Sequence, residues 1–228
     1  MRFDYYLFDL DNSLLYIPNY LDHFDEVLEE SLKRFSLPKI PNREQRNQLW
    51  SAGEEYIALL KKWGVVNSDD FWRYFDEIDF LKRQKLIRNK NMYFFKDVLD
   101  VLKRLRDNDK KLAIISNTAD YIIEFIMKEF SLNDYFHEIF GLGENKDQEL
   151  AKPNPEGILS VLKKLNFRPK RSTAIMIGDS IVDIFAAKRA NINACLIRRD
   201  KNKYADGFED WEYQPDFVID KLPEIFEL

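Results

Sequence analysis

Short runs of apolar residues limit the possible folds of this chain more than any other feature of its sequence. They span residues 5–8, 112–115, 174–177, 194–197 and 217–219. Apolar runs of this length, without alternating polar residues, are typical of strands that are buried on both faces of a sheet. Between them lie amphipathic stretches typical of helices, at residues 97–106, 121–130 and 155–165. Asn154 is expected to cap the last of these helices, with Pro155 at its first position. Strands that alternate with helices predict a doubly wound, parallel α/β sheet.

One long segment interrupts this alternation. It has no strand-like run, but contains three amphipathic stretches at about 20–35, 43–63 and 69–86. We therefore expect a Rossmann-like α/β core formed by residues 1–15 and 93–228, with an all-helical cap subdomain inserted as residues 16–92. Within this cap, the basic stretch from Lys82 to Lys85 is expected to form a solvated helix face.

Charge and composition restrict the class of partner. The 228 residues include 40 acidic and 35 basic side chains, a net charge of −5, which argues against a nucleic-acid-binding protein and favours a small diffusible partner. The single cysteine, Cys195, cannot form an internal disulfide, which fits a reducing compartment. No run approaches the ~20 apolar residues of a membrane span, and the start of the chain does not resemble a signal peptide. We expect a cytoplasmic protein without a membrane partner, monomeric by default, with a dimer left open.

Polar residues whose side chains can take part in catalysis or binding follow the first three apolar runs. They are Asp9 and Asp11 after the first run, Ser116 and Asn117 after the second, and Asp179 and Asp183 after the third. Lys152 lies in the loop before the helix that leads to the third run. Because ligands of open α/β sheets bind outside the carboxyl ends of the strands, we expect these residues to form one site.

The composition of this site predicts phosphoryl transfer. Four carboxylates at one sheet edge would repel one another unless a hard divalent cation such as Mg²⁺ neutralised them. Ser116 and Asn117 precede a predicted helix, whose N-terminal amides favour an anion. Lys152 adds a compact positive charge suited to a phosphate. Carboxylates, cation, helix N-terminus and lysine together are typical of phosphoryl-transfer sites.

The spacing of the first acidic pair indicates a mechanism. Side chains two apart at the end of a strand, such as Asp9 and Asp11, project to the same side. One carboxylate could attack phosphorus, while the other protonates the leaving alcohol and later activates water. Thr118 and Ser180, which also lie at strand ends, are expected to cap helices.

The four segments resemble, in the same order, the four motifs of the haloacid dehalogenase-like hydrolase superfamily. The resemblance implies that Asp9 is the nucleophile that becomes an aspartyl phosphate and that Asp11 is the general acid/base. Asn12 and Ser13 depart from the commoner glycine and threonine of the first motif. Asparagine tolerates turn conformations and serine keeps the hydroxyl, so both are compatible with the motif.

The resemblance also implies roles for the other residues. Ser116, Asn117 and Lys152 would bind phosphate. Mg²⁺ would be held by Asp9, the backbone carbonyl of Asp11 and Asp179, with Asp183 in or beside the metal shell. The helical insertion, residues 16–92, resembles the small cap of the first subclass of this superfamily.

These observations predict a Mg²⁺-dependent phosphatase, a phosphoric monoester hydrolase, that acts on a small phosphorylated metabolite through an aspartyl phosphate. A phosphomutase with the same residues remains the alternative, because the cap would decide that outcome. A receiver domain would carry its phosphorylated Asp after the third strand and no long insertion, so the motif order opposes it. A catalytically inactive phospho-accepting or partner-binding protein is a more remote alternative.

Overall fold

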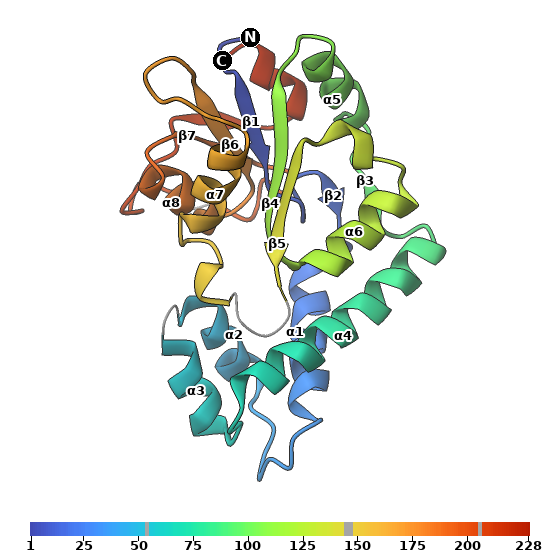
Figure 1. Cartoon of the computed structure of the whole chain (residues 1–228). Helices are drawn as coiled ribbons and strands as arrows, with labels where there is room; N and C mark the ends of the chain where they lie inside the picture. Colours follow the sequence, from blue (N-terminus) through green and yellow to red (C-terminus); the bar gives the residue numbers. More distant parts are fainter. Residues whose placement is uncertain (53–54, 144–147, 205–206) are drawn as a thin grey trace. The chain divides into compact units, whose positions relative to one another are not determined.

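The computed structural model describes residues 1–52, 55–143, 148–204 and 207–228. The chain divides into two compact units (Figure 1). The α/β unit comprises Met1–Tyr16, Phe94–Leu142 and Leu150–Leu228, and the helical unit comprises Ile17–Tyr93 and Gly143–Glu149. No helix in the described ranges is both long and apolar enough to cross a membrane.

The α/β unit is built on a six-stranded parallel sheet in the order β5-β4-β1-β6-β7-β8. Its strands are β1 (Tyr5–Phe8), β4 (Lys111–Ala119), β5 (Glu138–Leu142), β6 (Ala174–Gly178), β7 (Asn193–Ile197) and β8 (Phe217–Ile219). The expected doubly wound, parallel α/β fold is confirmed. Phe8 pairs with Ile114 of β4 and Ile177 of β6, so Asp9 follows at the level of Ile115 and Gly178.

Helices cover both faces of this sheet, as the apolar strands require (Figure 1). The helices of the unit are α5 (Val98–Arg106), α6 (Asp120–Glu129), α7 (Glu156–Lys164) and α8 (Ile181–Arg189). Figure 1 shows α7 and α8 on one side and α5 and α6 on the other. Ile158 of α7 and Ile184 of α8 join Leu7, Ile115 and Met176 of the sheet in one buried apolar cluster.

Several local features differ from the sequence expectations. Strand β5 was not predicted, because this edge strand is only partly buried and begins at Glu138. Strand β4 continues past Ser116 to Ala119, with an irregular register after Ile115. Helix α7 begins at Glu156, one residue later than expected, although the Asn154 side chain accepts a hydrogen bond from the Glu156 backbone N–H at 2.9 Å. Short elements in the described part of the chain include the paired strands β2 (Leu15–Tyr16) and β3 (Tyr93–Phe94) and the 3₁₀ turns η2 (Asn133–Tyr135), η3 (Gln148–Leu150) and η4 (Leu222–Phe226).

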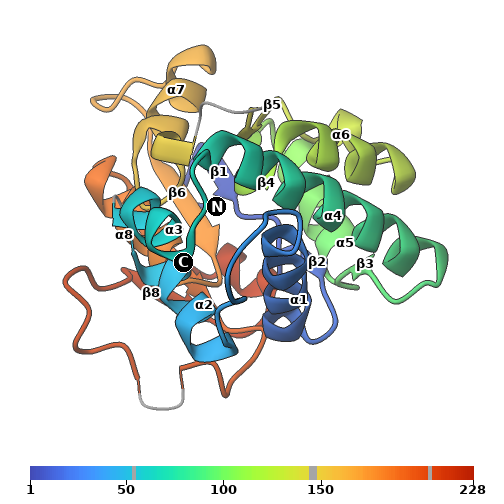
Figure 2. The same ribbon diagram turned by 90° about the horizontal axis from the view of Figure 1, so that it is seen from below.

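The helical unit contains α1 (Tyr20–Leu32), α2 (Arg43–Ser51), α3 (Tyr56–Trp63) and α4 (Ser68–Arg88). Helices α1 and α4 lie side by side (Figures 1 and 2). The amphipathic stretch expected at 43–63 is two helices, α2 and α3, on either side of residues 53–54, which lie outside the described residues. Buried apolar side chains from all four helices form a single core, which includes Val27, Leu49, Leu60 and Phe71.

The prediction that residues Lys82 to Lys85 form a solvated helix face is wrong for Arg83, because its side chain is fully buried. Its Nε donates to Asp79 Oδ2 at 2.7 Å, and the other oxygen of Asp79 lies 2.7 Å from His23 Nε2 on α1. Asp79 and Arg83 are four residues apart, so they share the helix face that packs against α1, whereas the sequence run extends around the helix. A buried arginine requires such a partner, because an unpaired charge in the interior is very costly.

Candidate active site

Lys152 links two carboxylates at the carboxyl edge of the sheet. Its Nζ donates to Asp9 Oδ1 at 2.6 Å, to Asp183 Oδ1 at 2.6 Å and to the Ile115 carbonyl at 2.8 Å. The ammonium group has three N–H bonds, so these contacts satisfy it fully. The Lys152 side chain is 4% exposed and that of Asp183 is 1% exposed. Residues from four separate parts of the chain therefore meet as the sequence pattern predicts.

The carboxylates of Asp9, Asp179 and Asp183 form one buried cluster. Each offers an oxygen atom within 4.8 Å of those of the others. Asp183 is positioned by the start of α8, where its Oδ2 accepts hydrogen bonds from the Ser180 backbone N–H at 3.0 Å and from Ser180 Oγ at 2.6 Å. Ser180 occupies the N-cap position of α8, as expected, but its hydroxyl donates to Asp183, and it is the Asp183 side chain that caps the Ser180 backbone N–H. Three converging carboxylates are the oxygen donors that a hard divalent cation prefers, so the donor set fits such a metal.

Gly178 is required by the close approach of Asp183. A Cβ atom at position 178 would lie 2.2 Å from Asp183 Cγ and 2.4 Å from its Oδ2. We expect Gly178→Ala to lower the free energy of unfolding by about 1–3 kcal/mol, because the fully buried Asp183 must shift to make room. Urea denaturation followed by circular dichroism measures this loss. A stability equal to that of the unsubstituted protein would contradict the assigned packing.

A second lysine, which the sequence analysis missed, contacts the cluster. Lys203 follows β7, and its Nζ donates to Asp179 Oδ2 at 2.7 Å, with 18% of the side chain exposed. Burial raises the pKa of Asp179 to about 6, against the opposing charge of Lys203. Burial also raises the pKa of Asp9 above its ordinary value, although Lys152 opposes the shift. No recognised motif surrounds Lys203; its position shortly after an apolar run was the available signal.

Asp11 is held by a different partner. Its Oδ2 accepts a hydrogen bond from Thr118 Oγ1 at 2.9 Å, whereas Asp9 Oδ2 accepts one from Ser13 Oγ at 3.0 Å. The prediction that Thr118 caps a helix is wrong, because β4 extends through Thr118 and α6 begins after Ala119 without a side-chain cap. The Thr118 hydroxyl instead orients the half-buried Asp11 carboxylate.

Asn117 holds the loop that carries Lys152. The Lys152 backbone N–H donates to Asn117 Oδ1 at 2.8 Å, and Asn117 Nδ2 donates back to the Lys152 carbonyl at 3.0 Å. This two-bond contact gives Asn117 a clear role in orienting Lys152, and its expected contact with phosphate stays a prediction. Ser116 is buried, and its hydroxyl oxygen accepts a hydrogen bond from the Thr118 backbone N–H at 3.2 Å. Its expected contact with phosphate also stays a prediction.

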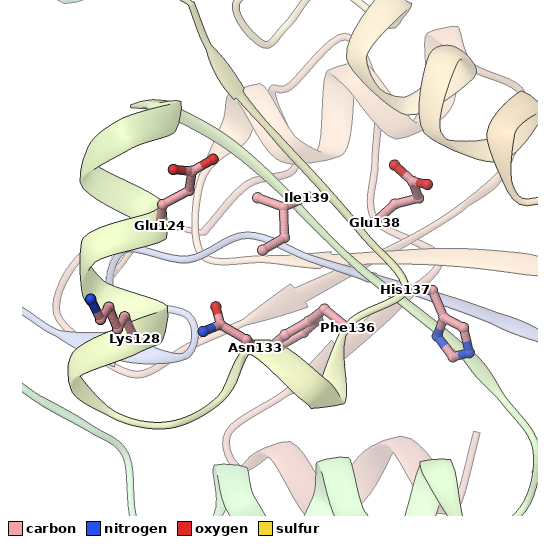
Figure 3. Close-up of a pocket in the computed structure, with 7 residues that line it drawn as sticks. All are labelled: Glu124, Lys128, Asn133, Phe136, His137, Glu138 and Ile139. Atoms are coloured by element: carbon pink, nitrogen blue, oxygen red, sulfur yellow. The ribbon is translucent and has the colours of Figure 1, made fainter.

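A separate hollow of about 540 Å³ lies elsewhere on the α/β unit. It is lined by Glu124, Lys128, Asn133, Phe136, His137, Glu138 and Ile139 (Figure 3). These residues come from α6, from the chain that leads into β5 and from the first two residues of β5, so the hollow lies toward the amino ends of the parallel strands. The His137 ring is already engaged by the Leu112 backbone N–H at 3.1 Å. The carboxylate cluster at the opposite edge is therefore the better candidate for chemistry.

Comparison with known proteins adds a family assignment. Residues 6–197 match the model of the haloacid dehalogenase-like hydrolase family. The chain is 26% identical over 223 residues to pyrophosphatase PpaX of Listeria monocytogenes, covering 97% of this chain and 94% of the relative. It is 32% identical over 128 residues to phosphoglycolate phosphatase 1 of Pseudomonas aeruginosa, covering 56% of this chain and 44% of the relative.

A solved structure agrees in fold. The crystal structure of CbbY from Rhodobacter sphaeroides in complex with phosphate superposes with a TM-score of 0.73 at 18% identity, covering 98% of this chain and 96% of CbbY. The family-model match thus agrees with the motifs at the strand ends, and CbbY shares the fold of this chain. The chain belongs to the haloacid dehalogenase-like hydrolase family and is a hydrolase of the phosphatase type.

Proposed function

We propose that this protein hydrolyses a small phosphorylated metabolite through an aspartyl phosphate formed on Asp9. The observation that carries the proposal is the buried contact of Lys152 with both Asp9 and Asp183, in a cluster that also contains Asp179. Such a site offers a carboxylate nucleophile next to a cation. The names of the relatives, a pyrophosphatase and a phosphoglycolate phosphatase, support a small phosphorylated substrate.

In the first half-reaction, a carboxylate oxygen of Asp9 attacks phosphorus. A bond forms between this oxygen and phosphorus, and the bond from phosphorus to the leaving oxygen breaks. Asp11, oriented by Thr118, donates its proton to the leaving oxygen, so the alcohol departs neutral. Lys152, at 2.6 Å from Asp9, would offset the negative charge that gathers as the phosphoryl group arrives.

The second half-reaction reverses the roles. Asp11, now ionised, accepts a proton from a water molecule as the water oxygen attacks phosphorus. The bond between phosphorus and the Asp9 oxygen breaks, which releases inorganic phosphate and regenerates the Asp9 carboxylate. The proton on Asp11 restores the starting state, so the residue acts as an acid and then as a base.

The acidic cluster would hold the metal of this reaction, which we propose to be Mg²⁺. Asp9, Asp179 and Asp183 supply carboxylate oxygens, and we add the Asp11 backbone carbonyl as a ligand. When bound, a divalent cation supplies charge that neutralises the carboxylates and the phosphoryl oxygens. We also propose that the helical insertion, residues 16–92, is the cap that selects the substrate.

Lys203 is expected to weaken metal binding, because its ammonium contacts Asp179, one of the proposed ligands. Lys203→Met should tighten the binding of Mg²⁺ about tenfold, equivalent to about 1.4 kcal/mol, since it removes a positive charge from the cluster. Calorimetric titration of the metal-free protein with Mg²⁺ measures the change.

The matched control is Lys201→Met in the same loop, where the lysine is 73% exposed and pairs with Asp220. It removes the same charge from the same loop but not from the cluster, so the affinity for Mg²⁺ should stay close to that of the unsubstituted protein. Equal affinities in the two variants would show that Lys203 does not compete with the metal.

The proposed function is tested with a panel of phosphorylated compounds. The panel contains pyrophosphate, phosphoglycolate, sugar monophosphates and bisphosphates, and an activated aryl phosphate, each assayed for phosphate release with Mg²⁺ and with a chelator. We expect release that the chelator abolishes. Failure to release phosphate from any compound would reject a phosphatase. Conversion of a sugar phosphate to its isomer without free phosphate would favour the phosphomutase instead.

A further inference from the structure

Arg199 makes an extensive set of contacts just beyond the end of β7. Its Nη1 and Nη2 donate to Asp97 Oδ2 at 2.7 Å and to Asp97 Oδ1 at 2.9 Å, and its Nε donates to the Ser13 carbonyl at 3.1 Å. The guanidinium carbon lies 4.2 Å from the centroid of the Phe95 ring. Only 9% of the Arg199 side chain is exposed. All three of its nitrogen atoms are therefore used within the α/β unit.

These contacts join two segments that are distant in sequence. Ser13 belongs to the segment by which the chain leaves the sheet after β1, and Phe95 and Asp97 belong to the segment by which it returns after the helical insertion. The Phe95 backbone N–H also donates to the Leu14 carbonyl at 2.9 Å. Arg199 thus braces the loop after β1 against the returning chain.

The Asp97 carboxylate that binds Arg199 is itself held in place by a further hydrogen bond. Besides the two bonds from Arg199, its Oδ2 accepts a hydrogen bond from the Leu222 backbone N–H at 3.0 Å. Burial alone would raise the pKa of Asp97, but the hydrogen bonds and charge of Arg199 outweigh it and hold the pKa below its ordinary value. A bidentate pair between a guanidinium and a carboxylate restricts both distance and angle, which a lysine ammonium does not.

The braced loop contains the first motif. Arg199 holds the backbone carbonyl of Ser13, and the Ser13 hydroxyl donates to Asp9 Oδ2 at 3.0 Å. Between Asp9 and Ser13 the chain turns through Asn12, whose φ of 57° lies in the left-handed region. A displacement of Ser13 would therefore move the hydrogen bond that orients the Asp9 carboxylate.

We propose that Arg199 is a positioning residue for the reaction: it holds Ser13, and through Ser13 the attacking carboxylate of Asp9. This inference rests on the proposed function, in which Asp9 is the nucleophile. Misplacement of a reacting group by about 1 Å can cost about 100-fold in rate, so loss of the brace should lower kcat more than it changes KM.

The test compares Arg199→Gln and Arg199→Lys with the neighbouring control Arg198→Gln. Arg198 pairs with Asp220 and is 39% exposed, so the control removes the same charge from the adjacent position. We expect both Arg199 variants to lose about 10- to 100-fold in kcat with KM within about threefold, and the control to keep both constants. Kinetics are measured well below the unfolding temperature of each variant.

Asp97→Asn provides a second route if the Arg199 variants fail to fold. It retains the arginine but weakens the bidentate pair, and it should lower kcat in the same direction. The inference is overturned if folded Arg199→Gln, or folded Asp97→Asn where the former does not fold, keeps kcat within twofold of the unsubstituted protein, or if KM rises as much as kcat falls. Absence of phosphatase activity in the unsubstituted protein would instead reject the proposed function, so the two failures are distinguishable.

Discussion

Replacement of Asp9 by asparagine is expected to reduce phosphate release about 10⁴-fold or more, with the fold retained. An amide of the same shape cannot attack phosphorus, so the covalent route is lost. Its oxygen can still accept a hydrogen bond from Ser13 Oγ or Lys152 Nζ, and Lys152 keeps its contact with Asp183. The circular dichroism spectrum of the variant should therefore match that of the unsubstituted protein.

The measurement combines steady-state phosphate release with mass spectrometry of enzyme quenched in acid during turnover. A mass increase of one phosphoryl group is expected in the unsubstituted protein and not in Asp9→Asn. The matched control is Asp4→Asn, the same exchange at the other end of β1, where the aspartate side chain is 50% exposed. If Asp9→Asn keeps a rate comparable to that of Asp4→Asn, Asp9 is not the nucleophile.

Replacement of Lys152 by methionine is expected to abolish activity and also to destabilise the fold. The change removes three hydrogen bonds and leaves Asp9 and Asp183 without their shared cation in a buried site. Removing one partner of a buried ion pair costs about 3–5 kcal/mol. Urea denaturation without divalent cations measures the loss, since a bound metal would replace the missing charge.

The loss of stability in Lys152→Met should depend on pH, because folding raises the pKa of Asp9. Burial already raises the pKa of Asp9, and removal of Lys152 eliminates the charge that opposes the rise. A carboxyl group whose pKa is raised by folding costs no stability at low pH, where it is protonated in both states. It costs increasingly more as the pH rises toward its pKa in the folded protein. The deficit of Lys152→Met should therefore be smaller at pH 5 than at pH 7.5.

The control for this prediction is Lys164→Met, which removes a lysine that is 62% exposed and pairs with Glu138. Exposed ion pairs contribute little to stability, so this variant should unfold almost like the unsubstituted protein at both pH values. The assigned electrostatics of the site would be contradicted if Lys152→Met lost no more free energy of unfolding than Lys164→Met, or if its loss were larger at pH 5 than at pH 7.5.

The sequence predicted the α/β fold and the convergence of Asp9, Lys152, Asp179 and Asp183 at the carboxyl edge of the sheet. Runs such as residues 5–8 and 174–177 are apolar throughout, and such runs require cover on both faces. Parallel strands bring their carboxyl ends to one edge, so the convergence of Asp9 with Asp179 follows from strand order. Both inferences depend on local composition and on a general rule of topology.

Side-chain partners were harder to predict. Thr118 was expected to cap a helix, yet it binds Asp11, because β4 continues further than its apolar residues indicate. Arg83 lies in a basic run and is nevertheless buried, because its position on α4 faces Asp79 and α1. In both cases the sequence pattern predicted an element of the correct type. The partner of the side chain was decided by where β4 ends for Thr118 and by which face of α4 is buried for Arg83.

The sequence by itself determined which residue types lie at the ends of the buried strands, and with them the chemistry that the site can perform. Only the tertiary structure decided which charges meet: Lys203 with Asp179, and Arg199 with Asp97. These pairs join residues that lie 24 and 102 positions apart in the chain. A long flexible side chain near a strand end can reach many partners, and packing selects one of them by the desolvation that an unpaired charge would incur.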